Sequence, residues 1–308
     1  MIMARPMMTV RCLLLAAAVP TAAAAQDTTA AKAALLAADR AAAASEAALR
    51  SALAPTATVL LPGREILHGR AAFEPHLAQA MPGRHGAAWT PVHAVVAAGR
   101  SFGCTTGVLH LAPADSMQPS TGRYAACWRQ ARTGAWRIVA LSVAYAPPAV
   151  KSLPDTIAAA PGSTGSPAPR GARAAARAAA RDMADADRTF GRFSADSGGP
   201  AGAFSRWIAA DGMMLGARAV PLRGPSQARQ AFAAFSPAGR FEWAPVDSLA
   251  VASRDGSLGF TIGEARIAPA PDAVSYAKYL TVWRREANGD YRWVFDIGSD
   301  RPAPRDAR

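Results

Sequence analysis

Apolar and polar residues alternate through residues 279–298, which read Y-L-T-V-W-R-R-E-A-N-G-D-Y-R-W-V-F-D-I-G. An alternation with a period of two, rich in aromatic and β-branched residues, predicts two strands, and the polar turn at 286–290 joins them as a hairpin. Residues 124–143 read Y-A-A-C-W-R-Q-A-R-T-G-A-W-R-I-V-A-L-S-V, and their tyrosine, tryptophan, glycine and arginine positions match those of the later segment at a constant spacing. The chain therefore contains one structural unit written twice.

The segments before each hairpin also repeat in the same order. In the first copy the pattern predicts helices at 30–53 and 70–81, and strands at 58–61, 89–96 and 101–111. In the second copy it predicts helices at 173–193, 201–210 and 222–235, and a short strand at 213–215. The blocks W-A-P-V and S-L-G-F-T-I-G of the second copy match W-T-P-V and S-F-G-C-T-T-G of the first. Helices followed by a run of antiparallel strands indicate an α+β fold.

Two segments outside the repeats complete the domain organisation. Residues 1–25 contain two arginines, an apolar run at 12–19 and a final A-A-A, the pattern of a secretory signal that is cleaved before Gln26. The apolar run is shorter than the roughly 18 residues that a membrane span needs. Residues 147–172 are rich in proline, glycine and serine, which predicts a semi-rigid linker. We therefore expect a signal peptide at 1–25, a first domain at 26–146, the linker at 147–172, a second domain at 173–300 and a tail at 301–308, in a periplasmic or secreted protein.

The chain is basic, with a formal net charge of +12 carried almost wholly by arginine. A basic protein can bind nucleic acid, but that function needs a clustered basic surface interleaved with aromatic residues. Here the arginines are scattered, so we expect no nucleic-acid partner. No segment after the signal is apolar enough to cross a membrane.

Cysteine and histidine positions bear on redox and metal chemistry. Cys104 and Cys127 lie on predicted neighbouring strands at nearly opposite positions, so either a disulfide in an oxidising compartment or a pair of buried thiols fits the pattern. All five histidines lie in the first copy, and no pair has the spacing of metal ligands on a helix or strand. The chain also lacks a phosphate-binding loop and a dinucleotide fingerprint. We expect neither a metal nor a cofactor.

The ordered blocks resemble SnoaL-like domains of the nuclear transport factor 2-like superfamily, and the second copy is the better match. The resemblance rests on Asp-Arg in the first helix, Trp-x-Pro-Val, Gly-Phe-Thr-x-Gly, Tyr-x-x-Val-Trp-Arg and Gly-x-Tyr-Arg-Trp-Val-x-Asp-x-Gly. It implies two tandem cones, each a curved antiparallel sheet wrapped around N-terminal helices with a pocket inside, the first of them degenerate. Single-domain relatives pair sheet to sheet, so the resemblance also implies an internal pseudo-dimer. The same fold serves many functions and does not by itself decide one.

The resemblance excludes one mechanism. In steroid-isomerase-like relatives the base is an aspartate shortly before a Pro-Gly turn, and the corresponding position here is about Gly216 in the second copy and Leu61 or Pro62 in the first. None of these side chains can take a proton, whereas a general base needs a titratable group beside the substrate. That mechanism is therefore absent from both copies.

Three acidic residues of the second copy remain as acid–base candidates: Asp211, Glu264 and Asp296. Asp296 is expected to share a strand face with Val294 and Gly298, and burial in a pocket on that face would raise its pKa. The alternative, which we favour, is a structural carboxylate paired with Arg284 or Arg292 or placed at a strand end. The first copy has Leu141 at the matching position, so the two copies cannot share an Asp296 mechanism.

Aromatic residues of the second copy either line an apolar pocket or form the core of the cone. The pocket candidates are Trp207, Trp243, Tyr279, Trp283 and Trp293. Two functions stay open at this point. The favoured one is an exported tandem protein that binds a small apolar or amphipathic ligand, or a protein partner, without catalysis. The other is a lyase- or isomerase-type enzyme that uses one of the three carboxylates.

Overall fold

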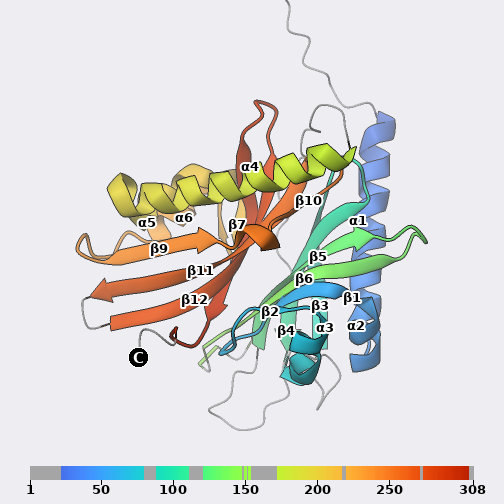
Figure 1. The fold of residues 1–308 in the computed structure, drawn as a ribbon, viewed down its shortest axis with the longest axis horizontal. Coiled ribbons are helices and arrows are strands. Elements are labelled where there is room, and N and C mark those ends of the chain that lie inside the picture. The colour runs from blue at the N-terminus through green and yellow to red at the C-terminus, as the bar shows by residue number, and fades with distance from the viewer. Residues whose placement is uncertain are drawn as a thin grey trace, which may run out of the picture.

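The chain folds into two helix-and-sheet units that lie against each other (Figure 1). The computed structural model describes residues 22–79, 88–110, 121–147, 149–150, 152–153, 172–216, 220–270 and 273–304. Residues 1–21 of the predicted signal peptide and most of the predicted linker lie outside these residues, whereas the last four residues of the predicted signal peptide begin α1. Both units are α+β, as the sequence predicts, and each wraps a curved sheet around helices from its own N-terminal part.

The first unit, which we call the N-terminal cone, has a six-stranded sheet in the order β2-β1-β6-β5-β4-β3. Its elements are α1 (Ala22–Ala42), α2 (Glu46–Ala52), β1 (Leu53–Leu60), β2 (Leu67–His68), α3 (Arg70–Phe73), a 3-10 helix (Glu74–Gln79), β3 (Ala88–Val96), β4 (Phe102–His110), β5 (Thr121–Gln130) and β6 (Trp136–Tyr145).

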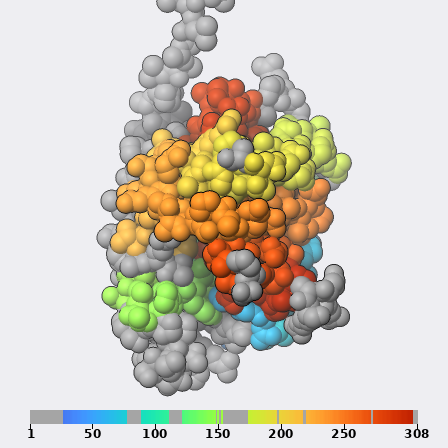
Figure 2. All heavy atoms as spheres, turned by 90° about the vertical axis from the view of Figure 1, so that its left-hand side faces the viewer, coloured from blue at the N-terminus to red at the C-terminus, as the bar shows by residue number. Residues whose placement is uncertain are grey.

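The second unit, the C-terminal cone, has a seven-stranded sheet in which β10-β11-β12-β13-β7-β8 are neighbours and β9 also pairs with β11. Figure 2 shows its residues, in yellow to red, above green and blue residues of the N-terminal cone. Its elements are α4 (Ala172–Phe193), a π-helix (Ser194–Gly198), α5 (Gly199–Trp207), β7 (Ile208–Met214), β8 (Leu222–Arg223), α6 (Gly224–Ala231), β9 (Arg240–Pro245), a 3-10 helix (Asp247–Leu249), β10 (Val251–Ala252), β11 (Leu258–Ala270), β12 (Ala273–Arg285) and β13 (Tyr291–Asp300).

Several details of the predicted elements are wrong. Residues 222–223 of the helix expected at 222–235 form β8, and the helix expected at 70–81 continues after Phe73 as a 3-10 helix. The helix expected at 30–53 is two helices, because Ser45 begins α2 by accepting a hydrogen bond from the amide of Ala48 at 3.1 Å. The helix expected at 201–210 ends at Trp207, where β7 begins. The sheets are mixed, since β1 runs parallel to β6 and β7 runs parallel to β13. These parallel pairs join the first and last strands of each unit, a pairing that local sequence patterns do not report.

The hairpin turns of the two cones have the same geometry. Gly134 and Gly289 occupy matching positions with φ of 84° and 93°, the left-handed region that only glycine adopts without strain. Each glycine amide bonds the carbonyl three residues earlier, at 3.0 Å, and each turn is closed by a second backbone bond of 2.8 Å. The repeated glycine is therefore a requirement of the turn.

A repeated polar network explains the other matching residues. In the C-terminal cone the hydroxyl of Tyr279 donates to Oδ2 of Asp187 at 3.0 Å, and the indole of Trp283 donates to Thr261 at 2.8 Å. A Cβ at Gly263 would lie 2.3 Å from the Tyr279 hydroxyl oxygen, so only glycine leaves room for that ring.

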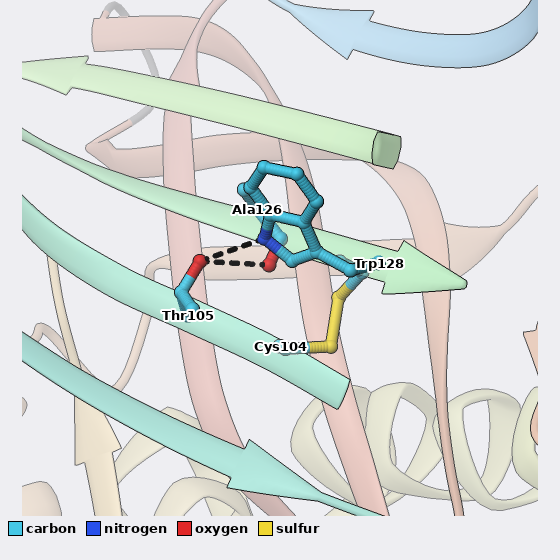
Figure 3. The surroundings of a disulfide bond; sticks show 5 residues. Cys104, Thr105, Ala126 and Trp128 are labelled. Carbon is cyan, nitrogen blue, oxygen red and sulfur yellow. Dashed lines mark hydrogen bonds between the residues drawn. A yellow bond between two sulfur atoms is a disulfide. The ribbon is translucent and has the colours of Figure 1, made fainter. Parts of the chain in front are cut away.

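The N-terminal cone contains the same network at equivalent positions. Tyr124 donates to Asp39 at 2.9 Å, and Trp128 donates to Thr105 at 2.9 Å, as Figure 3 shows for the second pair. Gly107 leaves the space for Tyr124, because a Cβ there would lie 2.7 Å from the hydroxyl oxygen. The motifs that carry the repeat thus tie the long helix of each cone to the inner face of its sheet.

The cores divide into three apolar clusters. One fills the N-terminal cone between α1, α2 and the sheet, and a second lies between α4, α5 and the inner face of the other sheet. The third cluster combines residues of both cones, including Phe102 of β4 and Phe260 of β11, whose rings stack at 6.4 Å. The outer faces of the two sheets therefore pack directly on each other.

The two cysteines lie within this third cluster. Cys104 and Cys127 are paired across β4 and β5, and their sulfurs form a disulfide (Figure 3). Of the two alternatives left by the sequence, the structure has the bond. The equivalent positions of the other cone hold Phe260 and Val282, which are also buried and paired across their strands. Among the helices that the structure describes, none is long and apolar enough to cross a membrane.

Candidate functional site

A cavity of about 400 Å³ lies inside the C-terminal cone, between its helices and the inner face of its sheet. This volume is within the range of small-molecule sites, roughly 300–1,000 Å³. Most of the wall is apolar and aromatic, and Asp296 contributes a carboxyl group from β13. The remaining lining residues are Phe190, Phe204, Met214, Gly216, Phe232, Phe241, Trp243, Ala265, Ile267, Ser275, Tyr276, Ala277, Lys278, Tyr279, Thr281, Gly298, Ser299 and Asp300.

Asp296 lies on the inner face of the sheet, opposite Thr281 of β12. The Thr281 hydroxyl donates to its Oδ1 at 2.6 Å. Burial raises the pKa of Asp296 to about 6, against the hydrogen bond from Thr281, which lowers it. Among the described residues, no arginine or lysine forms an ion pair with this carboxyl group. The expected pairing of Asp296 with Arg284 or Arg292 is therefore wrong.

A β-bulge in β13 places Val294 and Asp296 on opposite faces of the sheet. The pairing of β12 with β13 shifts register between Val282 and Trp283, so that Val294 has no partner. Val294 consequently packs in the cluster between the sheets, whereas Asp296 and Gly298 line the cavity. The prediction that Val294 and Asp296 share a face is wrong for this reason.

The other two acidic candidates lie outside the cavity in ion pairs. Asp211 receives two hydrogen bonds of 2.8 Å from the guanidinium of Arg284, which also contacts Glu286. Glu264 pairs with Arg301, and the same arginine contacts Glu65 of the N-terminal cone at 2.8 Å. Both carboxylates have fixed cationic partners, so neither is placed to act on a ligand in the cavity.

The predicted aromatic residues divide between cavity wall and core. Trp243 and Tyr279 line the cavity. Trp283 and Trp293 are fully buried behind the wall, and Trp207 is stacked on Phe190 at 5.6 Å. The sequence analysis missed four phenylalanines of the wall, which come from α4, α5, the end of α6 and β9: Phe190, Phe204, Phe232 and Phe241.

The helix periodicity around Asp187 could have located one of these phenylalanines. Phe190 follows Asp187 by three residues on α4, and positions with that spacing lie on one face of a helix. Since the Asp187 carboxyl group reaches Tyr279 inside the cone, the same face brings Phe190 to the cavity. Phe190 contacts Trp243 there, with ring centroids 4.5 Å apart.

Lys278 contributes to the cavity wall, but its ammonium group is directed elsewhere. Side chains alternate along β12, and Tyr279 and Thr281 take the inner face. The ammonium of Lys278 donates to the carbonyl of Asp300 at 2.6 Å. Burial lowers its pKa to about 8, while Glu65 of the other cone is one of the acidic groups that raise it. These neighbours place the charge at the contact between the cones.

The N-terminal cone differs at the equivalent inner positions. Ala126 and Leu141 are paired there, where the C-terminal cone has Thr281 and Asp296. Both residues are fully buried in the apolar cluster of the N-terminal cone. Of these equivalent inner positions, only the one in the C-terminal cone therefore has a carboxyl group.

The possible metal-ligating side chains are dispersed in the described part of the chain. No group of three or more histidine, cysteine, aspartate or glutamate side chains gathers there closely enough to hold an ion. Of the histidines, His93 packs against Phe295 of the other cone, with ring centroids 5.8 Å apart.

Comparisons with known proteins identify similar folds. No protein-family model matches the chain, and a search of curated proteins finds no match either. Among solved structures, the chain is similar to a ketosteroid isomerase-like protein from Erwinia carotovora atroseptica, with 16% identity and a TM-score of 0.29 over 42% of this chain and 96% of that one. An NTF2-like protein with a cystatin-like fold from Novosphingobium aromaticivorans has 15% identity and a TM-score of 0.27 over 42% and 85%.

A protein of unknown function with a cystatin-like fold from Methylobium petroleophilum has 19% identity and a TM-score of 0.26, covering 42% of this chain and 81% of that one. Each of these structures corresponds to less than half of the present chain. At such identities and TM-scores we take no activity from these proteins.

Proposed function

We propose that the C-terminal cone binds a small, largely apolar ligand in its cavity. The observation that carries this proposal is the aromatic-lined pocket of about 400 Å³, which the side chains of the cone leave unfilled. Natural cores are packed nearly without voids, and an open apolar space of this size is typical of a ligand site. The N-terminal cone serves as the structural partner of the binding cone.

A neutral apolar dye tests this proposal directly. N-phenyl-1-naphthylamine is expected to bind the protein with one site per chain, measured by the rise of its fluorescence on transfer from water. Ala265→Trp places an indole into the cavity from β11 and is expected to weaken dye binding about tenfold or more, because it fills the space that the dye needs.

Ala287→Trp is the matched control, since Ala287 is exposed in the hairpin turn. It adds the same side chain without touching the cavity, and dye binding is expected to stay unchanged. Equal dye binding by all three proteins would place the dye elsewhere and contradict the proposal.

A second candidate function is acid–base catalysis by Asp296. The specific observation is the Asp296 carboxyl group, which lies inside an apolar cavity. Burial raises its pKa to about 6, close to the range in which a general base works. An isomerase or lyase would use it to remove a proton from a carbon beside a carbonyl group.

Proton exchange from an apolar ketone measures this chemistry without a known substrate. In D₂O the protein is expected to exchange the α-protons of 2-tetralone, followed by NMR, faster than the Asp296→Asn variant by roughly a hundredfold or more. The Asp211→Asn variant, altered outside the cavity, is the control. Identical exchange rates for wild type and Asp296→Asn would exclude the enzyme function for this ketone class and leave binding alone.

We propose further that the protein is exported, with the mature chain beginning at Gln26. The Cys104–Cys127 disulfide supports this proposal, because such bonds persist in oxidising compartments. Cell fractionation followed by N-terminal sequencing tests it: the expected product lies in the periplasm or medium and starts at Gln26. A cytoplasmic product that retains residues 1–25 would contradict it.

Finally, we propose that the two cones form an internal pseudo-dimer. In a two-fold arrangement, equivalent elements of the two halves meet each other. Here β6 contacts β13 and β4 contacts β11, and each pair consists of equivalent strands. Hydrogen bonds from the N-terminal cone to Ser257 and Asp300 add polar contacts between the halves.

A further inference from the structure

The charges and aromatic rings of the cavity wall indicate which chemical class of ligand it would bind. This inference rests on the proposed binding function. Seven aromatic residues line the space from helices and strands on different sides: Phe190, Phe204, Phe232, Phe241, Trp243, Tyr276 and Tyr279. Several of these rings contact one another, with Phe204 and Phe232 at 4.6 Å and Phe241 and Trp243 at 5.1 Å between centroids. The faces of such rings carry the negative part of the aromatic quadrupole, so they attract a cation as well as offering apolar area.

Among the described residues, the Asp296 carboxyl group forms no ion pair with an arginine or lysine. Asp296 and Asp300 line it, and Asp187 lies close enough for the charge of Asp296 to raise its pKa. Lys278 is the one basic residue among the described lining residues, and its ammonium group is bonded to the Asp300 carbonyl. The protein as a whole is strongly basic, so this acidic interior is a local property.

We propose that the ligand of the C-terminal cone is an organic cation: an ammonium group, primary to quaternary, attached to an apolar body. The ammonium lies beside the Asp296 carboxylate and against the aromatic rings, where cation–π attraction and the carboxylate charge act together. The apolar body occupies the rest of the aromatic space.

Other ligand classes fit the same walls less well. An anion would enter a cavity whose nearest charges are carboxylates, and like charges in a poorly hydrated space repel strongly. A neutral ligand would displace water from Asp296 and leave a buried carboxylate with only the Thr281 hydroxyl as its partner. A cation removes that penalty because it supplies the missing countercharge.

Two probes of equal shape separate charge from size. Benzyltrimethylammonium and neopentylbenzene differ only in a quaternary nitrogen in place of a quaternary carbon. From cosolvent stocks at equal final concentration, the cation is expected to bind about tenfold or more tightly than its neutral isostere, measured by quenching of tryptophan fluorescence and checked by NMR titration.

The Asp296→Asn variant identifies the carboxylate as the source of this preference. It keeps the size of the side chain and is expected to bind the two probes with similar affinity, whereas Asp211→Asn, altered outside the cavity, keeps the wild-type preference. Retained dye binding by both variants shows that they are folded.

The pH dependence of binding provides a second readout. Benzyltrimethylammonium does not titrate, so its affinity follows the protein. Thr281 of β12, which donates to Asp296, does not ionise in this range, and Asp187 of α4 and Tyr279 of β12 interact electrostatically with Asp296. Asp300 and Lys278 also line the cavity, and Lys278, whose pKa burial lowers to about 8, stays charged below pH 7. Protons compete with the cation for the carboxylate, and affinity is expected to fall as the pH drops below about 6, by up to about tenfold per pH unit.

The outcomes distinguish this inference from the function on which it rests. If neopentylbenzene binds as tightly as the cation, or if Asp296→Asn keeps the preference, the cationic ligand is excluded while an apolar binding site remains. If neither these probes nor the neutral dye bind, the binding function itself fails. A preference that disappears in Asp296→Asn and below pH 6 supports an organic cation.

Discussion

Between pH 5 and pH 8 the free energy of unfolding is expected to fall by about 3 kcal/mol less in the Asp187→Asn variant than in the wild type. Burial raises the pKa of Asp187 to about 7, whereas an unfolded chain has an ordinary carboxyl pKa near 4. Each pKa unit corresponds to about 1.4 kcal/mol, and the interval from pH 5 to the folded pKa spans about two units.

The sign follows from proton uptake. Between the two pKa values the folded protein holds the proton and the unfolded chain does not, so folding is favoured by low pH and weakened as the pH rises through about 7. Asparagine cannot ionise, yet its carbonyl still accepts the hydrogen bond from Tyr279. Chemical denaturation of the wild type and the variant at pH 5, 6, 7 and 8 measures the difference between the two slopes.

The equivalent variant of the N-terminal cone tests the same effect. Burial raises the pKa of Asp39 to about 7 as well, and Tyr124 replaces Tyr279 as its donor, so Asp39→Asn is expected to flatten the profile equally. His93, whose pKa burial lowers to about 4, has the opposite pH dependence but contributes equally to all three proteins. Parallel profiles for wild type and variants would show that these carboxyl groups are already ionised when folded.

Introducing a charge between the sheets is expected to be still more disruptive. Phe260 is 1% exposed and stacks on Phe102 across the contact between the cones. Phe260→Glu removes this contact and buries a carboxylate without a cationic partner, a change that costs roughly 4 kcal/mol or more. Because the sheets share one apolar cluster, both cones are expected to lose stability, measured by urea denaturation with far-UV circular dichroism.

Val274→Glu is the matched control, since Val274 lies in the same sheet but is 40% exposed. It is expected to change stability by less than about 0.5 kcal/mol. If Phe260→Glu were as mild as the control, the sheets would be separable in solution, and the pseudo-dimer would be contradicted.

The repeat made most of the fold predictable. The matching residues Gly134 and Gly289 form turns of the same geometry. Tyr124 and Tyr279 each donate a hydrogen bond to an aspartate on the long helix of their cone. Patterns with a period of two located the long strands because alternate residues pack on opposite faces of a sheet. The parallel strand pairs were missed because they depend on contacts between distant segments.

The candidate site was less predictable, for reasons that concern individual residues. Alternation along β12 already places Arg284 on the face opposite Thr281, so an Arg284–Asp296 pair could have been ruled out from the sequence. The bulge at Val294 could not, since an extra residue in one strand leaves no mark on local composition. The phenylalanines of the wall come from separate elements, and only the folded cone brings them together.

The contact between the sheets also has a consequence for the conditions under which the protein works. A dimer of separate chains dissociates on dilution, whereas two halves on one chain meet at an effective concentration set by the linker. Association of the cones is thus independent of the amount of protein present. The fusion also frees one half from having to match the other: Leu141 can fill the interior of the N-terminal cone while Asp296 keeps a carboxyl group in the second. Two identical subunits could not differ in this way.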